Sequence, residues 1–373
     1  MNRKIVAFLL YVGGFVCLTA CTAAPDSPLL LTEETTEASE TTETAEIPES
    51  VTESDTLPLT DHEIRRRYAE AITALEPGVT LTVAGREWKY GAENDLKNLY
   101  YEVLSQYPEL KYAYDMTAEL SDGTAQCTFF YMPYKTGAYD KGLPAGSHTI
   151  NSLHSADVMA QSMIDGRERL PVAISDPTLA VEELQRAVGQ GGYGWISCTL
   201  NRDGTELLAS PPADMSLAQC VENINESFRL AGGILEEIIT EEMTDREKAE
   251  AAYAYITENV AYDFRYYSGK NDMPFTSTVA LGALRDHLAV CGGYSHALET
   301  LLDLCGIENY TVSGVCNGEY HAWNYVVLDG KGYYCDPTAD RNGMRNHFLL
   351  TEEEMKALGG YEWDAGFYLK LLQ

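Results

Sequence analysis

The sequence is poor in basic residues and rich in acidic ones. Its 373 residues include 26 Lys and Arg against 57 Asp and Glu, which gives a formal net charge of -31 at pH 7. Proteins that bind nucleic acid neutralise the phosphate backbone with clustered Lys and Arg, and this chain shows no such surface pattern. The composition therefore argues against nucleic acid as a partner, and it disfavours direct binding to an anionic membrane surface.

A second absence concerns residues 22–60, which contain no Lys, no Arg and no aromatic residue, whereas Thr and Glu predominate. Such a segment cannot bury enough apolar surface to offset the entropy of an ordered chain, so a folded acidic domain is excluded. We expect residues 21–60 to form a disordered acidic tether that is extended by repulsion among its own charges.

The first twenty residues have the pattern of an export signal. A short basic region precedes an apolar run over residues 5–20, which is marginal in length for a membrane-spanning helix. The run ends in Leu-Thr-Ala-Cys, and this ending resembles the lipobox of bacterial lipoproteins. We therefore expect a signal peptide over residues 1–20 and lipid on Cys21, so that the protein is exported and anchored on the extracytoplasmic side of a membrane. An uncleaved anchor, or an ordinary signal peptide with a chance cysteine, is the alternative.

The nine cysteines include no CxxC pair, the spacing that structural zinc sites commonly use. A zinc site built from Cys291, Cys305, His296 and the neighbouring Cys and His residues is therefore disfavoured. The acidic residues from Asp336 onward also lack the pattern of a calcium loop. We expect neither a metal nor a cofactor. Export permits disulfides but does not require them, and we expect mostly free, buried thiols.

Beyond the tether we expect two α+β domains, because a chain of this length exceeds one compact core of usual size. Residues 61–215 mix helical periodicity with alternating, aromatic-rich segments such as 127–131. They predict an α+β domain without a recognisable catalytic pattern, and its function stays unassigned. Residues 216–373 form the second expected domain, where helical periodicity becomes strong. Within it, Thr244 and Glu247 have the spacing of a capping box, which predicts a helix that runs to about residue 259.

A candidate nucleophile lies at the start of another predicted helix. Cys291 is followed by two glycines and by a helical run over residues 295–304 that stops at a Cys-Gly pair. At a helix N-terminus the free backbone amides and the helix dipole favour a thiolate, which is the nucleophilic form of cysteine. A buried structural cysteine at a helix start is the alternative for this feature taken alone.

A histidine and an aspartate follow on a predicted β-hairpin. His321 begins an alternating segment, and Asp329-Gly330 is a strong signal for a two-residue hairpin turn. With the turn at this position, Asp336 lies opposite Trp323 and on the same face as His321, close enough for a carboxylate to orient an imidazole. A slip of one residue would move Asp336 to the other face. Cysteine, histidine and carboxylate together supply what nucleophilic catalysis requires.

Three motifs in this region, V-C-G-G-Y at 290–294, H-A-W-N at 321–324 and D-P-T-A-D at 336–340, resemble the catalytic core of the transglutaminase-like superfamily. That superfamily is related to papain-like cysteine peptidases. The resemblance covers about residues 222–360 and leaves the N-terminal half aside. It implies a core in which a helix that carries the cysteine packs on an antiparallel sheet that carries the histidine and the aspartate.

The resemblance also implies roles for individual residues. Cys291 would be the nucleophile, His321 the general base and acid, and Asp336 the carboxylate that orients the imidazole. The backbone amide of Cys291 is expected to stabilise the oxyanion, and no side chain can be assigned to help it. Further candidates are expected to line the substrate cleft: Gly292, Gly293, Tyr294 and Trp323.

The acceptor of the acyl group decides the activity. Water would give a peptidase or an amidase, whereas a lysine amine would give a cross-linking transglutaminase. By analogy with exported relatives we favour hydrolysis of protein or peptide amides, with cell-wall peptide among the candidate substrates. The alternative from another class is a non-catalytic surface lipoprotein that keeps the fold and binds a peptide or the cell wall in its cleft.

Overall fold

The computed structural model describes residues 58–372. The predicted signal peptide, the lipidation at Cys21 and nearly all of the predicted tether lie outside these residues. Within them, no helix combines the length and the apolar character that crossing a membrane would take. Helices and antiparallel sheets make up the described chain, and the α+β prediction is confirmed.

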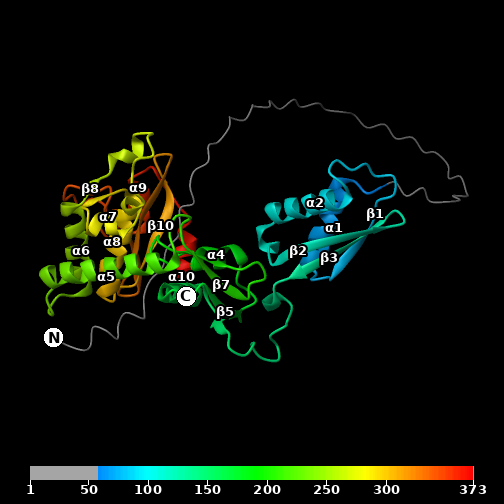
Figure 1. The fold of residues 1–373 in the computed structure, drawn as a ribbon, viewed down its shortest axis with the longest axis horizontal. Helices are drawn as coiled ribbons and strands as arrows, with labels where there is room; N and C mark the ends of the chain where they lie inside the picture. The colour runs from blue at the N-terminus through cyan, green and yellow to red at the C-terminus, as the bar shows by residue number, and fades with distance from the viewer. Residues whose placement is uncertain (1–57, 373) are drawn as a thin grey trace, which may run out of the picture.

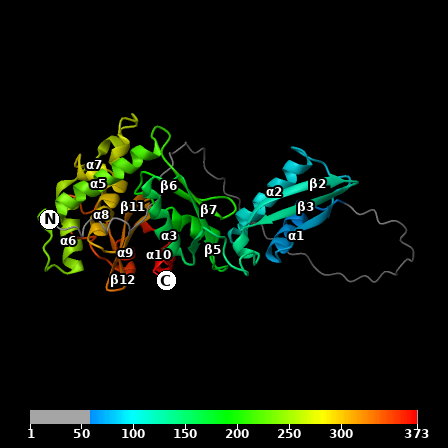
Figure 2. The same cartoon turned by 60° about the horizontal axis from the view of Figure 1, so that its bottom comes forward.

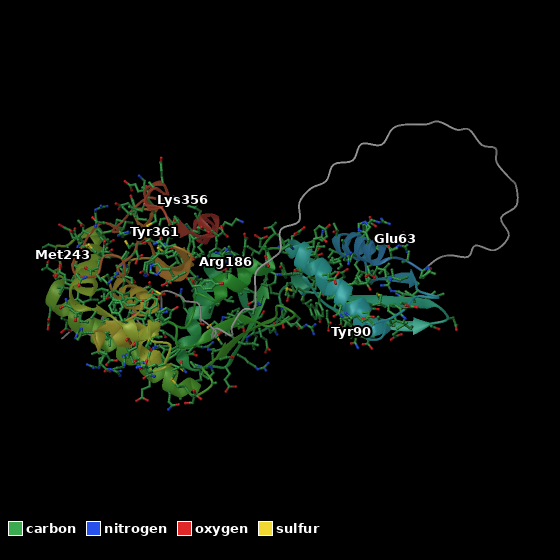
Figure 3. The ribbon with its side chains drawn as sticks, turned by 90° about the horizontal axis from the view of Figure 1, so that it is seen from above. Glu63, Tyr90, Arg186, Met243, Lys356 and Tyr361 are labelled. Atoms are coloured by element: carbon green, nitrogen blue, oxygen red, sulfur yellow. The ribbon has the colours of Figure 1, made fainter. Side chains whose placement is uncertain are left out.

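An N-terminal module begins the described chain and lies at one end of the molecule (Figure 1). Its helices and strands are α1 (Asp61–Thr73), β1 (Gly78–Thr82), α2 (Ala92–Gln106), β2 (Ala113–Ser121) and β3 (Thr124–Tyr131). The strands form an antiparallel sheet in the order β1-β3-β2. The helices bury Ile64, Tyr68 and Leu99 against this sheet, and these side chains form a hydrophobic core that is separate from the others. In Figure 3, Glu63 and Tyr90 mark this module.

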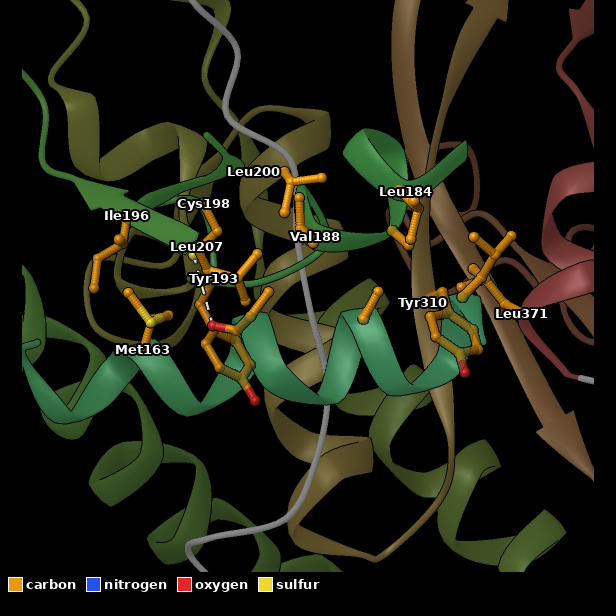
Figure 4. Packing of buried hydrophobic residues seen from close by; sticks show 14 of the residues in the cluster. Met163, Leu184, Val188, Tyr193, Ile196, Cys198, Leu200, Leu207, Tyr310 and Leu371 are labelled. Carbon is orange, nitrogen blue, oxygen red and sulfur yellow. Dashed lines mark hydrogen bonds between the residues drawn. The ribbon is translucent and has the colours of Figure 1, made fainter. Parts of the chain in front are cut away.

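A middle layer of short elements follows. It consists of β4 (His148–Ile150), α3 (Leu153–Gln161), β5 (Arg169–Ile174), α4 (Val181–Val188), β6 (Ser197–Leu200) and β7 (Glu206–Ser210). The sheet order is β4-β5-β7-β6, with a parallel β4/β5 pair and antiparallel pairs elsewhere. Its apolar side chains pack together with Tyr310 and Leu371 from the C-terminal part of the chain (Figure 4).

This shared packing crosses the expected boundary at residues 215/216, and the division into domains stays a prediction. The expected domain 61–215 is divided between two hydrophobic cores, and the second core continues into the C-terminal sheet through Tyr310, Val312 and Trp323. The physical reason is the size of the middle sheet. Its short strands cannot bury their apolar residues alone, so they pack against the face of a larger neighbour.

The C-terminal part combines helices with a further antiparallel sheet (Figures 1 and 2). Its helices are α5 (Leu217–Ile238), α6 (Asp245–Asn259), α7 (Ala280–Leu284), α8 (Cys291–Leu304), α9 (Glu352–Ala357) and α10 (Ala365–Leu371). Its strands are β8 (Ala261–Tyr262), β9 (Leu288–Ala289), β10 (Asn309–Cys316), β11 (Glu319–Leu328), β12 (Lys331–Cys335) and β13 (Tyr361–Glu362). The main sheet has the order β12-β11-β10-β13, and β8 pairs with β9 in parallel. The capping box of Thr244 and Glu247 begins α6 as predicted.

Helix α8 is the central element of this part. Its residues from Gly292 to Asp303 are all buried. Leu298 and Leu301 pack with Val326 of β11 in a hydrophobic core that is separate from the two described above. The hairpin of β11 and β12 turns at Asp329 and Gly330, whose φ angles of 51° and 70° are those that a tight hairpin turn needs. The helix therefore places its first residue against one end of the sheet.

Candidate active site

The start of α8 is tied closely to the segment that precedes it. Val290 is the N-cap residue of α8, and its N–H donates to the carbonyl of Ser277 at 2.9 Å. Gly293 faces the same carbonyl, and a Cβ atom at this position would lie 2.5 Å from it. The glycine thus permits close packing of the helix start, and Cys291 follows directly from this anchored turn.

The structure brings the three predicted catalytic residues together. His321 of β11 is hydrogen-bonded through Nε2 to Oδ2 of Asp336 at 2.7 Å. Cys291 lines the same cleft as His321, and its interaction with the imidazole raises the pKa of that ring. Because Asp336 occupies Nε2, Nδ1 is the ring nitrogen left for the thiol. The His321–Asp336 contact is the one that the hairpin register predicts.

The Asp336 carboxylate is fully buried and surrounded by donors. Oδ1 accepts from the N–H groups of Thr338 and Ala339, each at 3.0 Å. Oδ2 accepts from the Tyr361 hydroxyl at 2.7 Å in addition to its bond with His321. Burial alone would raise the pKa of Asp336, but His321 and these donors lower it below its ordinary value. The carboxylate is consequently ionised and fixed in orientation.

The protonation of His321 follows from its neighbours. Burial alone would lower the pKa of this imidazole, but the charge and hydrogen bond of Asp336, together with Cys291, outweigh it and raise the pKa to about 11. An imidazolium is therefore favoured beside the thiol. This is the charge state that a cysteine nucleophile requires, because the positive ring stabilises a neighbouring thiolate.

A cleft of about 750 Å³ opens onto these residues. Four aromatic side chains at its rim expose more than half of their surface: Phe264, Tyr266, Tyr267 and Tyr320. The first three belong to the 3-10 helix η4 (Phe264–Tyr267), and Tyr320 belongs to β11. The Tyr267 hydroxyl donates to Glu319 at 3.1 Å, which links the two rims.

Comparison with known proteins agrees with this arrangement. Residues 233–336 match the family model of the transglutaminase-like superfamily. These residues form a transglutaminase-like domain. Kyphoscoliosis peptidase from Mus musculus is 26% identical over 146 residues, which cover 35% of this chain and 22% of that protein. The Homo sapiens protein of the same name is 28% identical over 117 residues, which cover 28% of this chain and 17% of that protein.

One solved structure, described as a TGase, aligns with a TM-score of 0.28 and 17% sequence identity. The alignment covers 38% of this chain and 43% of that chain. The chain thus spans only about a fifth of the two curated relatives and less than half of the solved structure.

The four residues expected to line the substrate cleft occupy other places in the transglutaminase-like domain. Gly292 and Gly293 are buried against residues 277–279, Tyr294 is buried and donates to the Val260 carbonyl, and Trp323 lies fully buried under the His321 ring. The prediction for these four residues is wrong. Their small or aromatic side chains serve packing, because α8 approaches its neighbours too closely to leave a channel there.

Two residues of the site have no counterpart in the sequence prediction. Tyr361 lies in β13, beyond the matched residues 233–336, and its hydroxyl reaches Asp336. It is brought there because β13 pairs with β10, where Tyr361 lies opposite Cys316. In Figure 3 the label of Tyr361 lies in the same lobe as Lys356. Tyr262 of β8 lines the cleft. Burial raises the pKa of its hydroxyl most, and the interactions with Tyr267 and Cys291 raise it further. Tyr262 therefore brings a hydroxyl group to the cleft that Cys291 also lines.

Cys316 and His347 also line the cleft, whereas the buried cysteines and His296 lie in the packed interior. The seven described cysteines are free thiols, and four of them are buried, as predicted. Among the described residues, no group of three or more His, Cys, Asp or Glu side chains has the arrangement of a metal site. His296 is buried inside α8 and is bonded through Nδ1 to Glu299 at 3.0 Å.

Proposed function

We propose that this protein is a cysteine acyl-transfer enzyme that acts on protein or peptide amides through a thioester on Cys291, with water as the usual acceptor. The observation that carries the proposal is the His321 ring held between the Cys291 thiol and the buried Asp336 carboxylate. We further propose that the enzyme is exported and held at the membrane by lipid on Cys21, so that its substrates lie outside the membrane.

The geometry suggests how the residues would divide the reaction. The Cys291 sulfur attacks the amide carbon, and the resulting oxyanion accepts hydrogen bonds from the Cys291 N–H and the Tyr262 hydroxyl. His321 then donates its proton to the leaving amine, and the thioester forms. Neutral His321 removes a proton from water, which attacks the thioester and releases the acid. An amine in place of water would give a cross-linked product.

The aromatic rim supports a peptide as the substrate. Exposed tyrosine and phenylalanine side chains provide large, rigid contact area beside polar groups. Here they line the same open cleft as Cys291, which gives an extended chain a surface to bind. Cell-wall peptide is one candidate of this kind.

Selective alkylation of Cys291 at pH 6 is the first test. We expect iodoacetamide to label Cys291 at least about 100-fold faster than Cys305, because a thiolate beside an imidazolium reacts and a protonated thiol does not. Burial raises the pKa of Cys305 to about 11, so this half-buried thiol stays protonated at pH 6. Peptide mass spectrometry at successive times gives both rates. His321→Ala should remove the difference, and equal rates in the wild type would refute the proposal.

Removal of the Tyr361 hydroxyl tests the support of the triad. We expect Tyr361→Phe to lower kcat about 10-fold and to leave KM nearly unchanged, because Asp336 loses a donor that fixes its orientation. Tyr134→Phe is a matched control, since the Tyr134 hydroxyl donates at 2.9 Å to the Leu179 carbonyl away from the cleft. A change of kcat in Tyr134→Phe equal to that in Tyr361→Phe would show that the effect is not specific to the site.

A further inference from the structure

Some charged side chains of the cleft have a partner of opposite charge, and one does not. His321 and His347 line it, and each is paired with a buried carboxylate: Asp336 for the first and Asp340 for the second. Arg341 is the one Lys or Arg among the described residues that line the cleft. Unlike most arginines of the described chain, it forms no ion pair with any described Asp or Glu. The cleft therefore holds one cation without a partner of opposite charge.

The guanidinium of Arg341 is held in a defined place. Its Nη1 atom donates to the Thr338 carbonyl at 3.0 Å, in the loop that follows Asp336. Its Cζ atom lies 5.8 Å from the ring centre of Tyr262, the residue beside the nucleophile. These contacts fix one side of the guanidinium fork. The remaining N–H groups are available to a planar acceptor, and a carboxylate matches their spacing.

We propose that Arg341 binds a carboxylate of the substrate, so that the cleft selects peptides with an acidic residue near the reacting amide. The proposal rests on acyl transfer at Cys291, and it adds the substrate class. Glu319 also lines the cleft, and it would repel a negative group that Arg341 would attract. The net charge of the whole chain opposes this only weakly, since salt screens charges beyond about 8 Å.

Paired peptides test the inference directly. One set of labelled peptides carries Glu or Asp beside the candidate scissile amide, and the other carries Gln or Asn at the same place. We expect the wild type to prefer the acidic set in kcat/KM by about 10-fold to 100-fold, the usual range for a charge-assisted bidentate contact. Arg341→Gln should remove the preference by slowing only the acidic set, and Arg341→Lys should keep part of it.

A matched arginine in the same loop provides the control. Arg345 lies outside the cleft lining and pairs with Glu258 at 2.9 Å, so Arg345→Gln should keep the preference for acidic peptides. Thermal unfolding of each variant shows whether it is folded. Equal turnover of both peptide sets by the wild type, or an equal loss on both sets in Arg341→Gln, would overturn the inference.

Binding separates this inference from the proposed function. Fluorescence polarisation of the same peptides with Cys291→Ala measures affinity without turnover. Tighter binding of the acidic set supports the carboxylate site if adding Arg341→Gln removes it. This result holds even if the wild type cleaves none of the peptides, which would refute acyl transfer. Turnover without any acidic preference, in kinetics and in binding, leaves acyl transfer standing and refutes the role of Arg341.

Discussion

Asp336→Asn is expected to lower kcat about 10⁴-fold while KM changes little, as the equivalent change does in a serine protease triad. Each carboxylate oxygen of Asp336 accepts from two donors: the Thr338 and Ala339 N–H groups on one side, and His321 and Tyr361 on the other. An asparagine side chain must turn its NH₂ group towards one of these pairs. Turned towards His321, it would donate to Nε2 and leave the proton on Nδ1, facing the thiol.

The measurement needs a sensitive assay and a close control. Labelled peptides with and without an added primary amine report hydrolysis and transamidation together, and Cys291→Ala gives the background rate. Asp340→Asn is the matched control, because Asp340 is also buried and bonds Nδ1 of a second cleft histidine, His347, at 2.9 Å. We expect it to cost stability and to change kcat far less. If the two aspartates contributed equally to kcat, the assignment of Asp336 would be wrong.

The parts of the site that follow from sequence are those set by local rules. Asp329 and Gly330 adopt positive φ angles, and this tight turn fixes the register that brings Asp336 beside His321. The capping box at Thr244 begins α6 for an equally local reason. Such signals lie within a few residues of the feature they determine, so one sequence is enough to detect them.

The parts that could not be predicted depend on distant neighbours. Tyr361 acts from a two-residue strand with no periodic signal, and its role follows only from its pairing with Cys316. Gly293 lies beside the nucleophile in sequence, but the surface it approaches is the Ser277 carbonyl. Local pattern does not distinguish a glycine that admits substrate from one that admits a packed segment. The hydrophobic core of the middle layer likewise depends on a distant partner, because it continues into the C-terminal sheet of β10 and β11.

A group of buried carboxylates behind the active site has a separate consequence. Asp157 of α3, Glu299 and Asp303 of α8 are almost completely buried. Asp303 accepts from Tyr193 at 2.9 Å and from Asn309 at 2.8 Å. Burial raises the pKa of all three groups above their ordinary values, and the charge of Asp157 acts in the same direction on Glu299 and Asp303. Helices α8 and α3 therefore bury carboxyl groups whose protonated form is favoured in the folded protein.

The pH dependence of stability follows in sign from this packing. Burial, with the charge of Glu308, raises the pKa of Asp157 to about 8 against the lowering effect of Gln161. Between pH 4 and pH 8 the folded state then binds more protons at Asp157 than the unfolded state does. The contribution of Asp157 to the free energy of unfolding therefore falls as pH rises through this window. One pKa unit corresponds to about 1.4 kcal/mol, so Asp157 alone accounts for several kcal/mol.

Asp157→Asn should therefore flatten this dependence and stabilise the protein at pH 8 relative to the wild type. Asparagine keeps an oxygen for Gln161, which donates to Asp157 at 2.5 Å, and it has no proton to lose. Urea unfolding at pH 5 to 8, followed by tryptophan fluorescence in a Trp88→Phe background, confines the signal to tryptophans outside the N-terminal module. The exposed Asp214 is the control, and Asp214→Asn should keep the wild-type slope. An unchanged slope in Asp157→Asn would show that the carboxylate is ionised in the folded protein.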